Sequence, residues 1–306
     1  MFYDLNIPFT TATDPELPRT LHFLSELGYT VIALNHTLTT KLPATLTSPI
    51  PRVLPFPVPA TLTILHRLTL PLTTPLSNAR LKSLSADYDL LALRPTDEKT
   101  FQQACATLDG DIISLDLSQR LPFPFKFKPL SEAVKRGVRV EVSYAQAVAG
   151  DANARRNVIS NVTGLVRGSR GRGLVVGSEA RRAVELRGPW DVVNLLAVWG
   201  LGQERGYEAV TKEARGVVVV AGLKRRGWRG VVDVVDGGEE EKMLREGKGR
   251  EGNGVKSDTG KVNGKRKAEE MEEIPAPVVK GDKPLSKREM KRRAKAAKEA
   301  AAAVQD

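Results

Sequence analysis

Short apolar runs alternate with amphipathic stretches along the first three-quarters of the chain, a pattern typical of strands joined by helices. The candidate strands are residues 2–6, 30–35, 61–66, 88–93, 111–116, 138–143 and 173–177. Several are apolar on successive residues, as at 31–34, which indicates strands that are covered on both faces. The pattern therefore predicts an α/β fold with a parallel sheet.

Candidate helices lie between these strands, at residues 15–27, 96–108, 129–136, 151–166 and 190–200. Asp14 is a good N-cap for the first helix, with Pro15 in its first turn. No Gly-rich phosphate loop follows the first strand, which argues against a dinucleotide-binding sheet. Seven strands with intervening helices favour a TIM-like (β/α) barrel. Residues 216–221 are ambiguous, because their β-branched side chains favour a buried strand.

Two segments depart from the barrel pattern, which we assign to residues 1–236. Residues 41–59 are rich in Pro and Thr and are expected to form an exposed insertion. Residues 237–306 are charged and poor in aromatic side chains, so we expect a largely disordered tail. Within the tail, the basic and alanine-rich residues 284–304 could form a helix.

The composition excludes several classes of protein. Hydrophobic residues make up 41% of the 306 residues, enough for a sizeable core. The single cysteine, Cys105, excludes an internal disulfide and a cysteine-based zinc site. No apolar run approaches the ~20 residues of a membrane-spanning helix, and the first residues lack the pattern of a signal peptide. We therefore expect an intracellular protein with no membrane partner.

The net charge of +11 indicates a polyanionic partner such as RNA, because basic side chains near phosphates release condensed counterions. Residues 1–236 hold 29 of the 47 Lys and Arg residues and 22 of the 36 Asp and Glu residues. Most of the excess therefore belongs to the expected barrel and not to the tail. The alternative is a basic surface that serves only solubility.

The candidate RNA-binding residues form clusters in which arginine dominates, and arginine binds phosphate through a two-pronged contact. They are Lys126, Lys128, Arg155, Arg156, Arg170, Arg172, Arg181, Arg182, Arg187, Lys224, Arg225 and Arg226. Each cluster also has a structural interpretation as a solvated helix face or a flexible Gly–Arg turn. Phe125 and Phe127, which alternate with the lysines, are more often core residues than base-stacking residues.

Polar side chains end the candidate strands, where a barrel enzyme carries its reactive groups. They are Asp4, Asn6, His36, Arg94, Asp116, Glu141 and Ser178. Such a ring could hold a metal or a phosphate, but we favour a buried polar network that fixes the strand ends. The chain has three histidines and no Gly-x-Ser-x-Gly motif, so we expect no catalytic residue, no metal and no cofactor.

Four segments carry a resemblance to a known family. They are residues 2–8, residues 32–36, residues 121–126 and, most specifically, Ser178 with Glu-Leu-Arg-Gly-Pro-Trp-Asp-Val-Val-Asn-Leu at 185–195. In order and spacing they resemble the thirty-kilodalton protein subunit family of RNase P and RNase MRP, from residue 2 to about residue 226. The resemblance implies a barrel like that of the polymerase-and-histidinol-phosphatase hydrolases. Those enzymes typically end the first strand in His-x-His, where this chain has Asp4-Leu5-Asn6.

The resemblance implies a non-catalytic subunit that supports removal of tRNA 5′ leaders and processing of precursor rRNA, with RNA performing the chemistry. It implies as partners RNase P RNA, MRP RNA or both, a small ferredoxin-like subunit and other RNase P/MRP proteins, and precursor tRNA indirectly. It also favours a helix at 216–221, which we adopt. Basic runs at 264–267 and from Lys287 resemble nuclear-import signals, so we expect a nuclear, nucleolar location.

Two rival hypotheses stay open on the sequence alone. The first is a metal-dependent phosphoesterase of the related barrel class, which would use Asp4 and Glu141. The second is a protein-interaction scaffold that makes no direct contact with RNA.

Overall fold

The computed structural model describes residues 1–38, 46–74 and 76–226. The expected tail at 237–306, its basic helix at 284–304 and part of the insertion at 41–59 lie outside the described residues. The chain divides into two compact units, and the described residues all belong to the first, Met1–Glu241.

Seven parallel strands follow one another in chain order around a nearly closed barrel, as the sequence predicted. They are β1 (Phe2–Pro8), β2 (Tyr29–Thr37), β3 (Thr63–Leu72), β4 (Leu90–Pro95), β5 (Ile112–Ser114), β6 (Arg139–Ser143) and β7 (Leu174–Gly177). Although β1 and β7 do not pair as strands, the Glu179 amide donates to the Asn6 carbonyl at 2.9 Å. This bond brings the two edges of the sheet together at their carboxyl ends.

Helices connect most of the successive strands, and three more helices of the described part follow β7. They are α1 (Glu16–Glu26), α2 (Asn78–Leu84), α3 (Glu98–Ala106), α4 (Phe127–Lys135), α5 (Ala145–Val148), α6 (Ala152–Ser169), α7 (Pro189–Val198), α8 (Gln203–Val210) and α9 (Lys212–Arg226), with a 3-10 turn, η1 (Ala183–Glu185). The five predicted helices are present within a few residues of their expected bounds. The prediction of Asp14 as the N-cap was wrong by one residue, because Pro15 occupies that position; the Asp14 side chain accepts from the Glu16 amide at 3.0 Å from just outside the helix.

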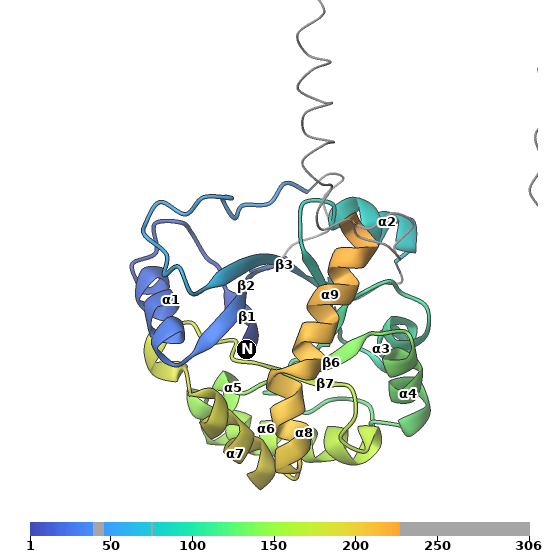
Figure 1. The fold of residues 1–306 in the computed structure, drawn as a ribbon. Coiled ribbons are helices and arrows are strands. Elements are labelled where there is room, and N and C mark those ends of the chain that lie inside the picture. The colour runs from blue at the N-terminus through green and yellow to red at the C-terminus, as the bar shows by residue number, and fades with distance from the viewer. Residues whose placement is uncertain (39–45, 75, 227–306) are drawn as a thin grey trace, which may run out of the picture. The chain divides into compact units, whose positions relative to one another are not determined.

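Helix α9 lies across one end of the barrel, in orange in Figure 1. Its Ala214, Val217 and Ala221 are buried against inward-facing strand residues, among them Leu5 and Ala33. Helix α9 is attached at the amino ends of the strands, because an ion pair joins its Glu213 to Arg139 at the start of β6. The prediction of a helix at 216–221 is confirmed, and the helix closes the amino-terminal end of the barrel.

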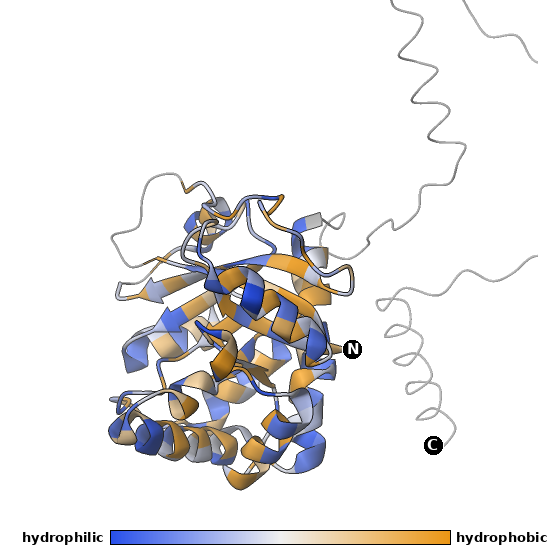
Figure 2. Ribbon diagram, turned by 90° about the vertical axis from the view of Figure 1, so that its left-hand side faces the viewer, coloured by the Kyte–Doolittle hydropathy of each residue, from blue (hydrophilic) through white to orange (hydrophobic). Residues whose placement is uncertain are grey.

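A second and larger core fills the space between the sheet and the surrounding helices. In Figure 2 the strands are mostly hydrophobic, whereas the helices mix hydrophobic and hydrophilic residues. Residues 46–62, which include the described part of the predicted insertion, form no helix or strand. The insertion is less exposed than expected, because Ile50 is buried and Phe56 packs against this core.

No helix of the described part combines the length and the apolar character needed to cross a bilayer.

Candidate nucleic-acid interface

An ion pair that the sequence analysis missed lies inside the barrel. Arg67 of β3 points inward, where its Nη1 and Nη2 donate to Oε1 and Oε2 of Glu141 at 2.5 and 2.6 Å. Both side chains are 0% exposed. An arginine within the apolar run of β3 was the available signal, since arginine is almost never fully buried unless it is paired.

Further side chains complete this pair into a closed circuit of hydrogen bonds. Arg67 Nε donates to Thr69 Oγ1 (3.2 Å), and that hydroxyl donates to Asn35 Oδ1 (2.7 Å). Asn35 Nδ2 donates to Asn6 Oδ1 (2.7 Å), and Asn6 Nδ2 returns to Glu141 Oε2 (3.1 Å). Oε1 of Glu141 therefore accepts from the guanidinium, Oε2 accepts from the guanidinium and the Asn6 amide, and the circuit holds four strands in register.

Asp4 and Ser178 meet at the seam between β1 and β7. The carboxylate Oδ1 of Asp4 accepts from the Ser178 amide at 3.0 Å and from the Asn6 amide at 3.1 Å. Burial raises the pKa of Asp4 from 3.8 to about 6, because the charged form loses its hydration. A Cβ at Gly177 would come within 2.8 Å of both Asn6 Cβ and Glu141 Oε1, so the close approach of the strands requires glycine there.

Arg94 lies at the carboxyl end of β4 and reaches across the mouth of the barrel. Its Nη2 donates to Ser114 Oγ at 3.2 Å and to Glu179 Oε1 at 2.8 Å. The other carboxylate oxygen of Glu179 accepts from Gln146 at 2.7 Å. Glu179 adopts a positive φ of 55°, which is uncommon outside glycine. Arg94 thus joins β4 to the segment after β7, separately from the Arg67 circuit.

The two other predicted members of the ring bond to partners outside the ring. His36 lies within 2.7 Å of the Tyr88 hydroxyl through its Nδ1, and partial burial lowers the pKa of its imidazole. Asp116 accepts from the amide and the hydroxyl of Ser118 at 3.1 and 2.5 Å. Among the described residues, no three His, Cys, Asp or Glu side chains are grouped to hold a metal ion.

Two of the candidate RNA-binding residues anchor α9. Lys224 Nζ lies 3.3 Å from Asp111 Oδ1, and Arg225 Nη2 lies 2.7 Å from Asp111 Oδ2. The Asp111 side chain is only 2% exposed, and its Oδ2 also accepts from the Leu91 amide. These two basic residues therefore fix the helix that closes the barrel. Arg226 ends α9, and its side chain lies outside the description.

Arg187 is held by the fold through its backbone and its side chain. Its amide donates to the Tyr144 hydroxyl and its carbonyl accepts from the Tyr29 hydroxyl, each at 3.1 Å. Its Nη1 donates to the carbonyls of Val184 and Leu186 at 2.9 and 2.7 Å. The guanidinium therefore supports the turn that precedes α7.

Two other candidates form surface ion pairs. Lys126 Nζ lies 2.9 Å from Glu98 Oε1, and Arg182 Nε lies 3.1 Å from Glu185 Oε1. The Lys126 and Arg182 side chains are 59% and 63% exposed, so a phosphate can compete with these carboxylates for them.

The remaining candidates project from α4, α6 and the turns that flank β7. Lys128, Arg156, Arg172 and Arg181 are exposed, and their side chains form no ion pair or hydrogen bond within the described residues. Arg155 is exposed as well, with Nε donating to the Ala147 carbonyl at 2.9 Å. All five side chains are therefore accessible to a phosphate.

Arg170 contacts an aromatic ring. Its guanidinium carbon lies 4.4 Å from the ring centre of Phe127. Phe127 is 46% exposed, whereas Phe125 is half-buried and packs edge-on against Phe101 with ring centres 6.0 Å apart. Phe125 is therefore a core residue and Phe127 a surface residue. Cys105 is buried too, and burial raises the pKa of its thiol to about 12.

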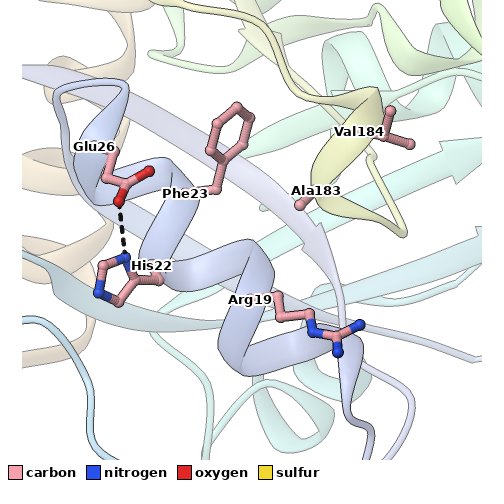
Figure 3. Close-up of a pocket in the computed structure, with 6 residues that line it drawn as sticks. All are labelled: Arg19, His22, Phe23, Glu26, Ala183 and Val184. Atoms are coloured by element: carbon pink, nitrogen blue, oxygen red, sulfur yellow. Dashed lines mark ion pairs between the residues drawn. The ribbon is translucent and has the colours of Figure 1, made fainter.

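An open pocket of about 380 Å³ lies between α1 and η1 (Figure 3). It is lined by Arg19, His22, Phe23, Glu26, Ala183 and Val184. His22 Nδ1 lies 3.3 Å from Glu26 Oε1 on its rim. The lining combines one aromatic ring with exposed ionic side chains, so this hollow offers no cluster of catalytic groups.

The family model for the RNase P subunit p30 matches residues 1–226 of the chain. The chain belongs to the RNase P subunit p30 family. The match ends where α9 ends, so residues 227–306 lie outside it.

Curated relatives agree with this p30 assignment. The chain is 37% identical to the probable ribonuclease P protein subunit 3 of Schizosaccharomyces pombe, covering 76% of this chain and 99% of that protein. It is 34% identical to the ribonuclease P protein subunit p30 of Mus musculus, covering 69% and 82%. It is 32% identical to the ribonuclease P/MRP protein subunit RPP1 of Saccharomyces cerevisiae, covering 78% and 86%.

A solved structure shares the fold of this p30-family chain. A chain of the cryo-EM structure of archaeal ribonuclease P with mature tRNA matches with a TM-score of 0.57 at 13% identity. The match covers 76% of this chain and 98% of the archaeal chain. The two chains therefore share a fold. Membership of the p30 family favours a ribonuclease P subunit over the rival phosphoesterase.

Proposed function

We propose that this chain is a protein subunit of RNase P, RNase MRP or both, and that it supports RNA processing without performing the chemistry itself. The match of the p30 family model to residues 1–226 carries the proposal. The relatives named above are subunits of ribonuclease P, and the one from Saccharomyces cerevisiae is named for both particles. Removal of tRNA 5′ leaders and processing of precursor rRNA are the corresponding reactions.

The interior of the barrel supports a structural role for the polar strand-end residues. A hydrolytic metal site needs carboxylate and imidazole groups that are free to bind the ion. Here Glu141 instead binds the buried guanidinium of Arg67, and His36 is paired with Tyr88. The network holds the strands, and through them the surface helices, in fixed positions.

The exposed arginines support direct contact with RNA. Arg156, Arg172 and Arg181 are free of intramolecular partners in the described part, so binding a phosphate would break no bond of the fold. Their contacts would follow RNA shape and backbone charge, because side chains cannot read the deep major groove of A-form RNA. In this proposal the RNA of the particle performs catalysis, and precursor tRNA is contacted only indirectly.

The remaining partners and the location are also part of this proposal. A small ferredoxin-like subunit and other RNase P/MRP proteins would bind surfaces of the barrel that RNA leaves free. The basic runs at 264–267 and from Lys287 would direct the chain to the nucleus and its nucleolus.

The proposal is tested by purifying the tagged full-length chain from its own cells and sequencing the RNA that accompanies it. We expect strong enrichment of an RNase P RNA, an MRP RNA or both over a tag-only control. Recovery of neither RNA would overturn the proposal.

A second assay addresses the rival phosphoesterase. The purified chain is incubated with Mn²⁺ or Zn²⁺ and a phosphoester substrate, and we expect no turnover above that of a denatured control. Turnover that is lost in the Asp4→Asn variant, with the variant still folded by thermal melting, would show a protein active site instead.

A further inference from the structure

Helix α6 ends with an arginine in a conformation that favours glycine. Arg170 has φ 56° and ψ 35°, in the left-handed region where the Cβ of an L-residue is crowded. Glycine commonly occupies this position of a helix end, and Gly171 and Gly173 follow with φ of 67° each. An unfavourable backbone conformation that persists at an exposed site is a reason to look for a function of the side chain.

The Arg170 side chain lies over an exposed aromatic ring. Its guanidinium carbon is 4.4 Å from the ring centre of Phe127, the first residue of α4. Phe127 is 46% exposed and belongs to neither hydrophobic core, unlike Phe123 and Phe125 of the same segment. A guanidinium plane and a phenyl ring both stack on nucleic-acid bases, so the pair offers planar groups for stacking at the surface.

Close packing fixes the two elements that carry this pair. A Cβ at Gly168 in α6 would lie 2.8 Å from the carbonyl oxygen of Phe125, just before α4. A Cβ at Gly173 would lie 2.2 Å from a methyl group of Val134 in α4. The end of α6 and the following turn therefore press against α4 through two glycines, and the stacked pair is preformed.

Free basic side chains flank the pair. Lys128 is adjacent to Phe127, Arg167 lies one helical turn before Arg170, and Arg172 follows it by two residues. All three are exposed and form no ion pair or hydrogen bond within the described residues. A flat stacking surface beside several uncompensated cations suits an unpaired nucleotide, because its base stacks while the neighbouring phosphates find positive charge.

We propose that Arg170 and Phe127 form a stacking platform for an unpaired RNA base, with Lys128, Arg167 and Arg172 binding the adjacent phosphates. The proposal deepens the RNA-binding role proposed above and rests on it. Single-stranded RNA is favoured over a duplex, because the bases of an A-form helix are stacked on one another and unavailable. An acidic protein segment would use the cations but would gain nothing from the stacking surface.

The test measures binding of the full-length chain to fluorescein-labelled oligouridylate and to an abasic oligonucleotide of the same length and charge. We expect the wild type to prefer the base-containing RNA by about tenfold, given the usual strength of base–aromatic stacking. Phe127→Leu should remove most of this preference and leave the salt dependence unchanged, because the variant keeps every charge. Arg170→Lys should also reduce the preference, since lysine keeps the charge without a planar face.

Tyr207→Leu is the matched control, because Tyr207 is also an exposed aromatic residue, at 42%, on the separate helix α8. It should keep the full preference. Equal binding of both oligonucleotides by the wild type, or an undiminished preference in Phe127→Leu, would overturn the stacking platform. So would a polyglutamate peptide that binds as tightly as the RNA and is weakened equally by Phe127→Leu. Thermal melting of each variant confirms that it is folded.

Recovery of RNA from cells separates this proposal from the function on which it rests. A chain that recovers RNase P RNA but shows no base preference in vitro retains its function and lacks the platform. A chain that shows the preference but recovers neither RNase P nor MRP RNA has the platform and a different RNA partner.

Discussion

At the residue scale, the barrel depends on charges that water does not reach. Arg67 and Glu141 are completely buried, so each has lost its hydration. Their paired contacts offset that loss only because every nitrogen of Arg67 is bonded, with further bonds to Thr69 and to the Leu5 carbonyl at 2.6 Å. A buried pair with such complete hydrogen bonding is sensitive to the loss of either partner.

We therefore predict that Glu141→Gln lowers the free energy of unfolding by about 3–5 kcal/mol, because the amide turns a donor toward the buried guanidinium. Urea unfolding of the full-length chain measures this change. Arg67→Met combined with Glu141→Leu should lose less than the sum of the two single changes. The exposed pair of His22 and Glu26 supplies the control, since Glu26→Gln should change stability by less than about 1 kcal/mol.

Asp4 makes stability depend on pH in the direction opposite to most carboxylates. Burial raises its pKa in the folded protein from 3.8 to about 6, so the folded state binds the proton more tightly than the unfolded state. Its contribution is fully present below the unfolded pKa and is lost as the pH rises through the folded pKa. The shift corresponds to roughly 3 kcal/mol at most.

We accordingly predict that Asp4→Asn gains stability relative to the wild type as the pH rises from about 4 to about 7. Unfolding by urea at several pH values gives the difference between the two proteins, in which the other titrating groups cancel. A difference that does not change with pH would show that Asp4 titrates normally in the fold.

At the element scale, α9 shows tertiary packing prevailing over local preference. Four consecutive valines at 217–220 favour a strand, yet they form a helix that closes the barrel. Val217 enters the barrel and is 2% exposed, whereas Val219 on the opposite side is 49% exposed. The inner side of the barrel offers apolar surface to one face of α9. Ion pairs with Asp111 and Arg139 hold the helix in place.

The two valines provide a matched pair of variants. Val217→Ser should destabilise the protein by about 2 kcal/mol or more, since it leaves a cavity and buries a hydroxyl. Val219→Ser should change stability by less than about 0.5 kcal/mol, because the residue faces solvent. Thermal unfolding distinguishes them, and equal effects would contradict the placement of α9.

At the scale of the whole molecule, the fold divides the basic residues into two groups. Lys224, Arg225 and Arg187 are engaged by carboxylates or carbonyls of the chain itself. Arg156 and Arg181 are exposed and unpaired within the described part. The number of basic residues alone therefore overstates how many of them are available to bind a polyanion.

Reversing exposed arginines tests this division. The combined change of Arg155, Arg156, Arg181 and Arg182 to Glu should weaken RNA binding and flatten its dependence on salt. The logarithmic slope should fall by about 0.7 to 0.9 for each phosphate that the variant no longer binds. Binding titrations over a range of salt concentrations measure the slope. Lys212→Glu with Arg215→Glu, on the exposed side of α9, is the control for general charge. An unchanged slope in the fourfold variant would remove those arginines from the interface.

The sequence predicted the order and type of most elements, because alternation of apolar and polar residues is a local property. Strand bounds shifted where the local pattern was weak: β3 runs to Leu72, beyond the predicted end at residue 66. The short helices α2 and α8 were missed, since seven or eight residues give too few turns for a clear period. The p30 resemblance decided the helix at 216–221, which propensity alone favoured as a strand.

The candidate site was predicted less well, for a geometric reason. A sequence shows which residue ends a strand but not which way its side chain points when the register is irregular. The register of β1 shifts between Asp4 and Ile7, and Asn6 turns into the barrel as a result. His36 and Asp116 were placed in the same ring, and they bond instead to Tyr88 and Ser118. Arg67 was missed, because its partner Glu141 lies 74 residues away.

The sequence by itself determined the alternation of strands and helices, the positive charge of the barrel and the membership of the p30 family. These properties depend on neighbouring residues and on their order along the chain. The tertiary structure decided which charges are neutralised within the molecule and which remain for a partner. Ion pairing depends on distances between residues that are far apart in sequence, and only the folded chain fixes those distances.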